Sequence, residues 1–336
     1  MRLTEEATPG GVSRRTLLRG TALGLAAIGL SHPAISAASY PSRPVRIVVP
    51  YAPGGAVDTL ARRMAQKLTE RLGQTFIVEN KSGATGTIGT AEVARSAPDG
   101  LTLLALDNTY ATLPYLFSNL PFDHATAFTP ITLTAVSPVV LVVGAKSPYP
   151  DLAGFIAAAK RKPDTLSFGS GGVGSSLHLS AVALQQLTDI RLFHVPYKGG
   201  GEAVRATLSN EVDCCLTSLG SSLSGIQSGL LRALAICGER RAEALPDVPT
   251  FHEAILRRFD LVNWSGLAAP RGTPPEVIDT LYKAMAASLK DEDMVQFLHS
   301  LASTPGGIPP KAFAQMIKRE AELWGSVAQR AGIERQ

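Results

Sequence analysis

The sequence predicts an α/β fold made of two similarly built lobes, and three observations lead to this prediction. Short apolar stretches alternate with longer amphipathic ones, as strands and helices do in α/β proteins. Glycine-rich turns occupy the strand-to-helix position in both halves of the chain, at residues 52–58 and 169–176. The length of 336 residues suits about two domains. Between the strand–helix alternation of the first half and that of the second half, an apolar stretch at residues 131–144 is interrupted by Ser137 and Pro138. We therefore expect two strands there that lead from one lobe to the other.

The first 38 residues have the composition of an export signal. Residues 13–19 read SRRTLLR, a twin-arginine motif, and an apolar run at residues 21–30 and small residues at 36–38 follow it. A membrane anchor is the alternative, but this apolar run is shorter than the ~20 residues that span a bilayer. The sequence therefore predicts a signal peptide over residues 1–38, export by the twin-arginine route and a periplasmic location.

The first predicted strand covers residues 45–50, and an amphipathic helix follows it. Apolar residues at helical spacing define the buried face of this helix: Val57, Leu60, Ala61, Met64, Ala65, Leu68 and Leu72. Gly73 predicts the end of the helix. We expect the next two strands over residues 74–79 and 101–106.

The second series begins with a helix over residues 151–160. Further strands and helices are then expected over residues 165–169, 175–187, 192–195, 201–208, 212–216 and 231–237. An extended segment over 260–269 precedes Thr273, which is placed to cap a helix opened by two prolines and running to about residue 289. The last helix begins after the proline pair at 309–310.

The glycine-rich turns at residues 52–58, 82–89 and 169–176 have a chemistry of their own. Glycine allows a close approach to the backbone, and the helix that follows directs free N–H groups and the positive end of its dipole toward an anion. Such a turn can hold a carboxylate or phosphate without lysine or arginine. Asp58 has two interpretations: it belongs to the first turn of its helix, or it faces the cleft and accepts a hydrogen bond from a ligand.

Several enzyme classes lack their motifs in this chain. The turn at residues 52–58 does not have G-x-G-x-x-G spacing, and Pro53 removes an N–H that a pyrophosphate would need, which disfavours a dinucleotide site. The sequence contains no G-x-S-x-G nucleophile motif and no nucleotide-binding P-loop. His252 and Glu253 begin like a zinc-protease helix, but position 256 is Leu.

Metal, cofactor and nucleic-acid partners are also not indicated. The histidines are scattered without ligand spacing, although His178 stands out because it lies one turn into the helix after the third glycine turn. Three cysteines contain no C-x-x-C pair; Cys214 and Cys215 should point to opposite faces of a strand and behave as small buried residues. A net charge of only +4, without a basic stripe, argues against nucleic acid.

A series of segments resembles one known family. They read YPSRPVRIVVPYAPGG at 40–55, VENKSGATG at 78–86, APDGLTL at 97–103, FGSGGVGS at 168–175, VPYKGG at 195–200, LPDVPT at 245–250 and LAAPRGTP at 267–274. In this order, and along nearly the whole mature chain, they resemble the Bug family, the periplasmic substrate-binding proteins of tripartite tricarboxylate transporters.

The resemblance implies a two-lobed periplasmic binding protein fold, a Venus flytrap of type II-like architecture with crossing hinge strands. Lobe 1 would comprise residues 39–140 and 264–336, and lobe 2 residues 141–263. The implied function is non-enzymatic capture of a small carboxylate solute by a monomer that has no cofactor and delivers the solute to membrane transporter subunits. A sensor that presents the same ligand to a signalling partner, and a periplasmic enzyme acting on a small acid, are the alternatives.

The resemblance and the glycine turns together imply a set of ligand-binding residues and no catalytic or metal-binding ones. They are Tyr51, Ala52, Pro53, Gly54, Gly55, Asp58, Asn108, Thr109, Ser170, Gly171, Gly172, Val173, Gly174, Ser175, Tyr197 and Thr217. Family members often carry an acid at the position of Thr217. A neutral hydroxyl there favours a plain organic or aromatic acid over an amine-bearing amino acid.

Overall fold

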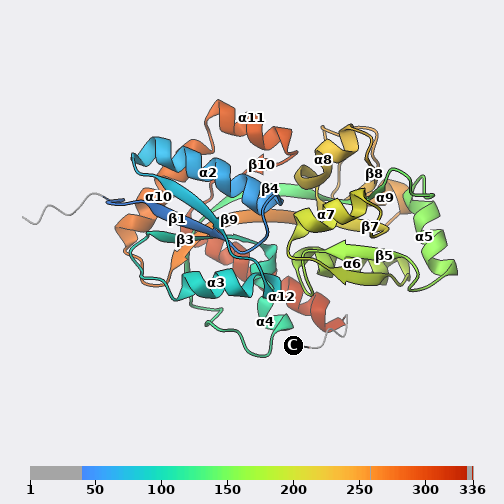
Figure 1. Ribbon diagram of the computed structural model, residues 1–336, viewed down its shortest axis with the longest axis horizontal. Helices are drawn as coiled ribbons and strands as arrows, with labels where there is room; N and C mark the ends of the chain where they lie inside the picture. The colour runs from blue at the N-terminus through green and yellow to red at the C-terminus, as the bar shows by residue number, and fades with distance from the viewer. Residues whose placement is uncertain (1–39, 258, 331–334, 336) are drawn as a thin grey trace, which may run out of the picture. The chain divides into compact units, whose positions relative to one another are not determined.

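The computed structural model describes residues 40–257, 259–330 and 335, so the predicted signal peptide lies outside the described residues. The described chain has the predicted α/β architecture (Figure 1). The strands are β1 (Val45–Val49), β2 (Phe76–Asn80), β3 (Thr102–Asp107), β4 (Phe128–Gly144), β5 (Ser167–Ser170), β6 (Phe193–Pro196), β7 (Cys214–Ser218), β8 (Leu231–Ile236), β9 (Val262–Pro270) and β10 (Thr304–Pro305). Each predicted strand other than the pair expected at 131–144 is confirmed to within about two residues.

The helices complete the alternation that the sequence predicts. They are α2 (Ala56–Leu72), the 3₁₀ turn η1 (Ala84–Gly86), α3 (Thr87–Ala94), α4 (Asn108–Leu116), α5 (Leu152–Arg161), α6 (Ser176–Thr188), α7 (Gly200–Leu208), α8 (Leu219–Gln227), α9 (Phe251–Ile255), α10 (Pro275–Ser288), α11 (Glu292–Ser300) and α12 (Pro310–Arg330). The prediction omitted α3, α4, α8, α9 and α11. No helix in the described ranges is long and apolar enough to cross a membrane.

The strands form two parallel series that antiparallel strands join. The order is β2-β1-β3-β9-β4-β7-β5-β6, with β8 and β10 paired to β4. Strand β1 is parallel to β2 and β3, and β5 is parallel to β6 and β7, whereas β9 is antiparallel to β3 and β4. We call the part with β1–β3, α2–α4 and α10–α12 lobe 1, and the part with β5–β8 and α5–α9 lobe 2.

The apolar stretch around Pro138 is one continuous strand, not the two that we expected. Strand β4 runs through Ser137 and Pro138 without interruption and passes from lobe 1 to lobe 2 (Figure 1). Up to Pro138 it pairs with β9, and from Val139 onward it pairs with β7 and β8. Proline lacks the N–H that a ladder needs, and it is tolerated here because it lies at the change of partner strand. The chain leaves lobe 1 through β4 and returns through β9.

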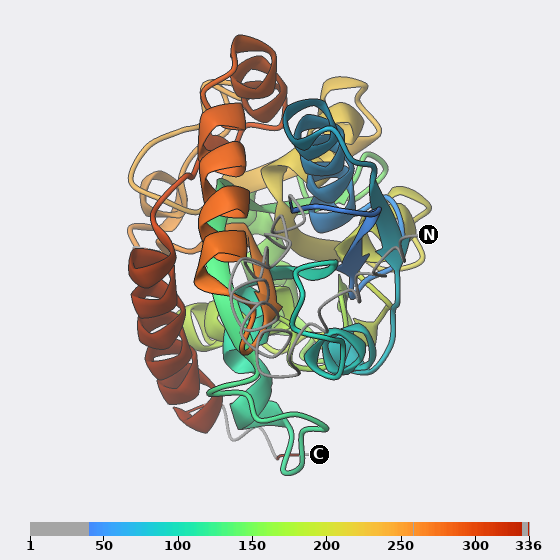
Figure 2. The ribbon, with the colours of Figure 1, turned by 90° about the vertical axis from the view of Figure 1, so that its left-hand side faces the viewer.

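Helices cover both faces of the lobe 1 sheet. On β1, Val45, Ile47 and Val49 pack with the apolar faces of α2 and α10, whereas Val48 packs on the opposite face with α4 and α12. This alternation follows from the two-residue period of a strand. In Figure 2, the orange helix α10 lies beside the blue helix α2, so the C-terminal part of the chain completes the lobe that the N-terminal part begins.

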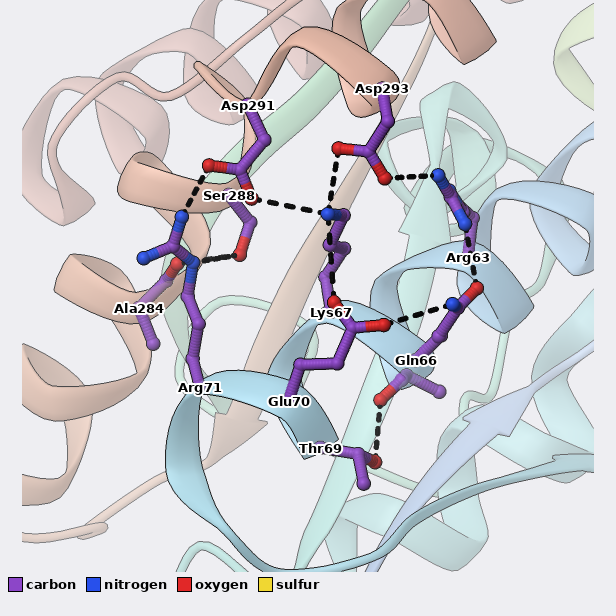
Figure 3. A network of polar contacts seen from close by, with 11 residues as sticks. Arg63, Gln66, Lys67, Thr69, Glu70, Arg71, Ala284, Ser288, Asp291 and Asp293 are labelled. Atoms are coloured by element: carbon purple, nitrogen blue, oxygen red, sulfur yellow. Dashed lines mark hydrogen bonds and ion pairs between the residues drawn. The ribbon is translucent and has the colours of Figure 1, made fainter.

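A network of ion pairs attaches α2 to the start of α11 (Figure 3). The Lys67 ammonium lies 2.7 Å from Asp293, 3.2 Å from Asp291 and 3.5 Å from Glu70, and its side chain is only 8% exposed. Arg63 contacts Asp293, and Arg71 contacts Asp291. Two acids from one segment thus bind three cations spaced along one face of α2.

Lobe 2 has a similar two-sided core. Cys214 packs on one face with Phe168 and the helices α5 and α6, and Cys215 packs on the other face with α7 and α8. Both thiols and that of Cys237 are buried and free. The prediction that the two adjacent cysteines point to opposite faces is confirmed.

Thr273 does not cap α10, contrary to the prediction. The N-cap position is Pro274, and no side chain caps this helix. The Thr273 hydroxyl donates instead to the carbonyl of Pro270, 2.8 Å away. Because Pro275 occupies the first turn and has no N–H, the helix start has fewer donors for a cap to satisfy.

Candidate functional site

A pocket lies where residues of both lobes meet. Its free volume is about 40 Å³, room for only a few water molecules. Its lining comes from the loops before α2, α4, α6, α7 and α8 and from β9: Tyr51, Ala52, Gly55, Ala56, Val57, Asp58, Asp107, Thr109, Gly171, Ser175, Ser176, Leu177, Gly200, Thr217, Ser218, Ser221 and Asn263. Five helices therefore begin at one pocket.

Three of these helices begin without a side-chain cap. The N-cap residues are Gly55 for α2, Gly199 for α7 and Ser218 for α8, and none of them caps its helix with a side-chain hydrogen bond. The Ser218 hydroxyl instead contacts that of Ser221, 3.0 Å away. Because the first N–H groups of a helix have no partner within the helix, these three termini leave donors available at the pocket. The helix dipoles add partial positive charge there.

The other two helix starts are satisfied from within the chain. The Ser175 side chain accepts a hydrogen bond from the His178 N–H at the start of α6. At the start of α4, the Asp107 carboxylate accepts from the Thr109 N–H at 3.0 Å. These two termini have fewer free donors than those of α2, α7 and α8.

The lining contains no lysine, arginine or histidine, so any bound anion would depend on backbone N–H and hydroxyl groups. It does contain two carboxylates, Asp58 and Asp107. Asp58 is held by its own surroundings: it accepts from Gly54 N–H at 2.9 Å and from Asn80 Nδ2 at 2.9 Å, and it pairs with Arg62. Burial by itself would raise the pKa of Asp58, but the hydrogen bonds from Arg62, Gly54 and Asn80 hold that pKa below its usual range.

Of the two interpretations of Asp58, the structure therefore shows a carboxylate that organises the first glycine turn. It lies in the first turn of α2, and its oxygens bridge the turn at Gly54 to β2 at Asn80 and to the next turn of the helix at Arg62. It also lines the pocket. Gly54 has a φ of +89°, in the left-handed region that glycine adopts without strain.

Asp107 has different surroundings. Its Oδ1 accepts from the Tyr51 hydroxyl at 2.7 Å and from the Thr109 N–H, and both donors are neutral groups. Its side chain has no ion pair with any described residue. Burial raises the pKa of Asp107, although the hydrogen bonds from Tyr51 and Thr109 act in the opposite direction. Burial also raises the pKa of Tyr51, and the charge of Asp107 adds to the effect.

The predicted ligand-binding residues divide into two groups. Those that line the pocket are Tyr51, Ala52, Gly55, Asp58, Thr109, Gly171, Ser175 and Thr217. Those that do not line it are Pro53, Gly54, Asn108, Ser170, Gly172, Val173, Gly174 and Tyr197. Gly54 lines a neighbouring cleft, whose free volume is about 100 Å³.

Side chains in the second group have other partners. Asn108 accepts from the Trp264 N–H and donates to the Val262 carbonyl and to Glu320, which joins α4 to β9 and α12. The Tyr197 hydroxyl donates to Glu211 at 2.9 Å. The sequence placed Asn108 at the carboxyl end of a strand correctly, but neighbouring segments of the chain decide where its side chain points.

Several lining residues escaped the sequence analysis. Asn263 comes from β9, Ser218 and Ser221 from the start of α8, and Asp107 from the end of β3. Thr217 and Asn263 each have a buried side-chain oxygen without a hydrogen-bond partner: Oγ1 of Thr217, which is 1% exposed, and Oδ1 of Asn263, which is 6% exposed. Buried polar atoms normally have partners, so two unpaired oxygens in one pocket point to a ligand or bound water.

The lobes contact each other directly around the pocket. The Thr85 hydroxyl donates to the Val173 carbonyl at 2.8 Å, and the Ala52 N–H donates to the Lys198 carbonyl at 3.2 Å. On another side the Thr112 hydroxyl donates to the Gly174 carbonyl at 3.0 Å. These contacts hold the two lobes together around a pocket whose free volume is about 40 Å³.

His178, which the sequence analysis singled out, supports the third glycine turn from behind. Its Nδ1 accepts from the Gly174 N–H at 2.8 Å, and its ring stacks on that of His194 at 4.0 Å. His194 in turn contacts the Ser170 hydroxyl at 2.6 Å. Burial, and then the neighbouring His194, lower the pKa of His178 to about 3. Two neutral imidazoles thus hold the turn at both of its ends.

Other parts of the described chain offer no comparable site. A larger cavity of about 400 Å³ lies between α12 and the lobe 1 sheet, but its lining is mainly apolar, and its Tyr110 and His124 satisfy each other through the carbonyls of both residues. Within the described ranges no three His, Cys, Asp or Glu side chains are grouped as metal ligands.

Comparison with known proteins decides the family. The family model described as "Tripartite tricarboxylate transporter family receptor" matches residues 60–333. The chain belongs to this receptor family. BugT of Bordetella pertussis, a relative in the family, is 34% identical over 311 residues, which cover 92% of this chain and 95% of BugT. The Bug-family resemblance of the sequence is thereby confirmed.

Solved structures of receptor-family proteins confirm the two-lobed periplasmic binding protein fold. The chain is 33% identical to the periplasmic binding protein BugD, with a TM-score of 0.85, and the match covers 88% of this chain and all (100%) of BugD. It is 32% identical to Rpa4515 of R. palustris with adipate (TM-score 0.85, 88% of this chain and 100% of that chain). It is also 32% identical to MatC of Rhodopseudomonas palustris with bound malate (TM-score 0.82, 86% and 100%).

Proposed function

We propose that this protein is a periplasmic solute-binding protein that captures a small carboxylate in the pocket between its lobes. The observation that carries the proposal is the convergence of three uncapped helix starts, those of α2, α7 and α8, on a pocket without a basic side chain. Free N–H groups and aligned dipoles at helix starts bind anions. A carboxylate placed there would receive the hydrogen bonds that the chain does not supply itself.

Two relatives support the class of ligand. Their structures contain adipate in one case and malate in the other, both small carboxylates, on a fold that this chain matches along most of its length. The family name adds a tricarboxylate transporter as the membrane partner, and we extend that partnership to this chain as part of the proposal. We propose a binding role without turnover, since the helix starts at the pocket offer N–H groups that would hold an acid by hydrogen bonds.

We further propose lobe boundaries at residues 140/141 and 263/264, as the sequence predicts, and a periplasmic location reached by the twin-arginine route. Packing supports the second boundary, because Trp264 is buried in a core of lobe 1. It puts the first crossing within about two residues of the predicted one, because both Val139 and Leu141 belong to a core of lobe 2. In this view closure is a shift of population toward a form that the ligand binds better. The pocket volume of about 40 Å³ supports it, because capture then requires an open form.

A melting scan of the mature protein tests the proposal. The probes are mono-, di- and tricarboxylates and aromatic acids, each paired with its uncharged methyl ester at the same concentration. A ligand at about a hundred times its dissociation constant adds roughly 2.7 kcal/mol of stability. We expect a clear rise in Tm with at least one acid and none with its ester. If folded protein responds to no carboxylate at millimolar concentration, the proposal is wrong.

A further inference from the structure

The pocket has a second chemical character besides its free N–H groups, because several of its side chains present oxygen acceptors. Asp107 at the end of β3, Asn263 at the start of β9 and Thr217 near the end of β7 all line it. Each is buried, with exposed fractions of 8%, 6% and 1%. Oδ1 of Asn263 and Oγ1 of Thr217 have no hydrogen-bond partner among the residues that the structure describes. A carboxylate ligand cannot satisfy an amide oxygen or another carboxylate, since neither has a proton to donate.

The fold brings these acceptors to neighbouring strands. Asp107 pairs with Ser265 of β9, and Asn263 lies two residues from Ser265, on the same face of that strand. Strand β9 pairs with β4, and β4 pairs with β7, which carries Thr217. The strand order β3-β9-β4-β7 therefore collects the three oxygens at one end of the sheet.

Asp107 is the acidic member of this group, and it differs from Asp58 in lacking a cation. Asp58, the other acid of the pocket, is neutralised by Arg62 at 2.9 Å. The hydrogen-bond donors to Asp107 are neutral groups, among them the Tyr51 hydroxyl and the Thr109 N–H, and Asp107 forms no ion pair with any residue that the structure describes. A buried carboxylate without a cation is costly. A plain anionic ligand would add a like charge, whereas a ligand with its own donor would supply the missing partner.

We propose that the solute is a small carboxylic acid that also carries a hydrogen-bond donor, an ammonium or a hydroxyl group, and that Asp107 accepts from this donor together with Asn263 and Thr217. The inference rests on the proposed function, because the carboxylate end of the solute is assigned to the helix starts. The neutral hydroxyl at position 217 by itself disfavours an amine-bearing ligand. The structure places a different acid, Asp107, in the same pocket.

Asp107 also caps α4, so its presence has a structural reason as well. This role predicts a loss of stability when the cap is removed, but it predicts no preference among ligands. Asparagine is as good an N-cap as aspartate. Asp107→Asn therefore keeps the cap and removes only the charge, which separates the two roles.

The experiment measures the affinity of the mature protein for succinate, malate and aspartate by isothermal titration calorimetry. These four-carbon dicarboxylates differ only in the group on one carbon: hydrogen, hydroxyl or ammonium. Propionate, lactate and alanine form a parallel one-carboxylate series. We expect the donor-bearing member of at least one series to bind at least tenfold more tightly than the plain acid. In Asp107→Asn that ratio should fall at least fivefold, most strongly for an ammonium ligand.

Asp151→Asn is the matched control, because Asp151 caps α5 in the same manner and does not line the pocket. It should leave the ratio unchanged. If no acid of either series binds and the carboxylate melting scan is also silent, the proposed function itself fails. If plain acids bind as tightly as their donor-bearing partners, the function stands and this inference is wrong. If the preference exists but Asp107→Asn does not reduce it, the assignment of Asp107 is wrong.

Discussion

At Gly201, near the start of α7, the backbones of the two lobes lie close together. A methyl group added there would lie 2.9 Å from the backbone nitrogen of Gly55 and 3.0 Å from the carbonyl carbon and oxygen of Gly54. All three atoms belong to lobe 1, and all are backbone atoms that cannot rotate away. The φ of Gly201 is not in the left-handed region, so alanine would fit the helix itself. Gly201→Ala should therefore oppose contact between the lobes without straining lobe 2.

The size of the effect follows from the overlap. Forcing an extra methyl group into a packed contact costs typically about 1–3 kcal/mol, and 1.4 kcal/mol corresponds to a tenfold change in an equilibrium. Because only the form with lobes in contact would carry this cost, the apparent affinity for the solute should fall by about 5- to 150-fold. Alanine is favoured over glycine within a helix by up to about 1 kcal/mol. The free energy of unfolding without ligand should therefore stay the same or rise.

Titration calorimetry gives the affinity, and small-angle X-ray scattering gives the radius of gyration with and without solute. We expect a variant that stays expanded at solute concentrations that compact the wild-type protein. Gly225→Ala is the control: it adds a methyl group to α8 of the same lobe, but the nearest atoms belong to Leu231 and Leu208 of lobe 2. If Gly201→Ala binds solute with wild-type affinity, the contact seen between the lobes does not belong to the ligand-bound form and the reasoning fails.

Two further predictions concern stability. The pKa of His178 is about 3 in the folded protein and about 6.5 in the unfolded chain, so the unfolded chain takes up the proton first as the pH falls. The stability that the neutral His178 side chain contributes is therefore complete above pH 6.5 and is lost as the pH falls toward 3. Between pH 7 and pH 5 the free energy of unfolding should fall by about 2 kcal/mol because of His178. Urea denaturation at both pH values should show this fall in the wild-type protein and a fall smaller by about that amount in His178→Phe. Equal falls in both proteins would contradict the prediction. Lys67→Met should lower the free energy of unfolding by only about 1 kcal/mol, because Asp291 and Asp293 keep Arg71 and Arg63 as partners. The variant should bind solute with unchanged affinity. A loss of affinity in calorimetry would contradict this and show that the ion-pair network is coupled to the pocket.

Local patterns in the sequence predict the elements that frame the pocket. The strand at 45–50, the glycine turn and the amphipathic helix after it all occur, because each depends on near neighbours: alternating apolar residues, glycine at the turn and a helical period in α2. The same kind of local argument failed at Pro138. A proline within an apolar run indicates a break, and only the change of partner strand along β4 explains why the strand continues.

The side chains that distinguish one solute from another are harder to predict, because segments far apart in the chain bring them together. Asn263 and Thr217 lie on strands that are separated by another strand, and nothing near either residue in the sequence indicates that its oxygen is left without a partner. Asp107 has the local features of an ordinary helix cap, and it becomes unusual only when its surroundings show no cation. Asp58 shows the same limit: its position in the sequence left two interpretations open, and only the contact with Asn80, from another strand, shows how its carboxylate is held.

The glycines at the helix starts have two roles: they leave backbone N–H groups free for the solute, and they let the backbones of the two lobes come close together. Serine or aspartate at the N-cap of α2 would stabilise this helix by roughly a few tenths of a kcal/mol relative to glycine, and its side chain would occupy an N–H group that we assign to the solute. Gly55 and Gly199 leave these groups free. The absence of a side chain at Gly201 also lets the backbones of the two lobes come together over the pocket. The glycine-rich turns therefore supply both the anion donors and the close contact of the lobes, and a substitution that improves either helix should weaken capture.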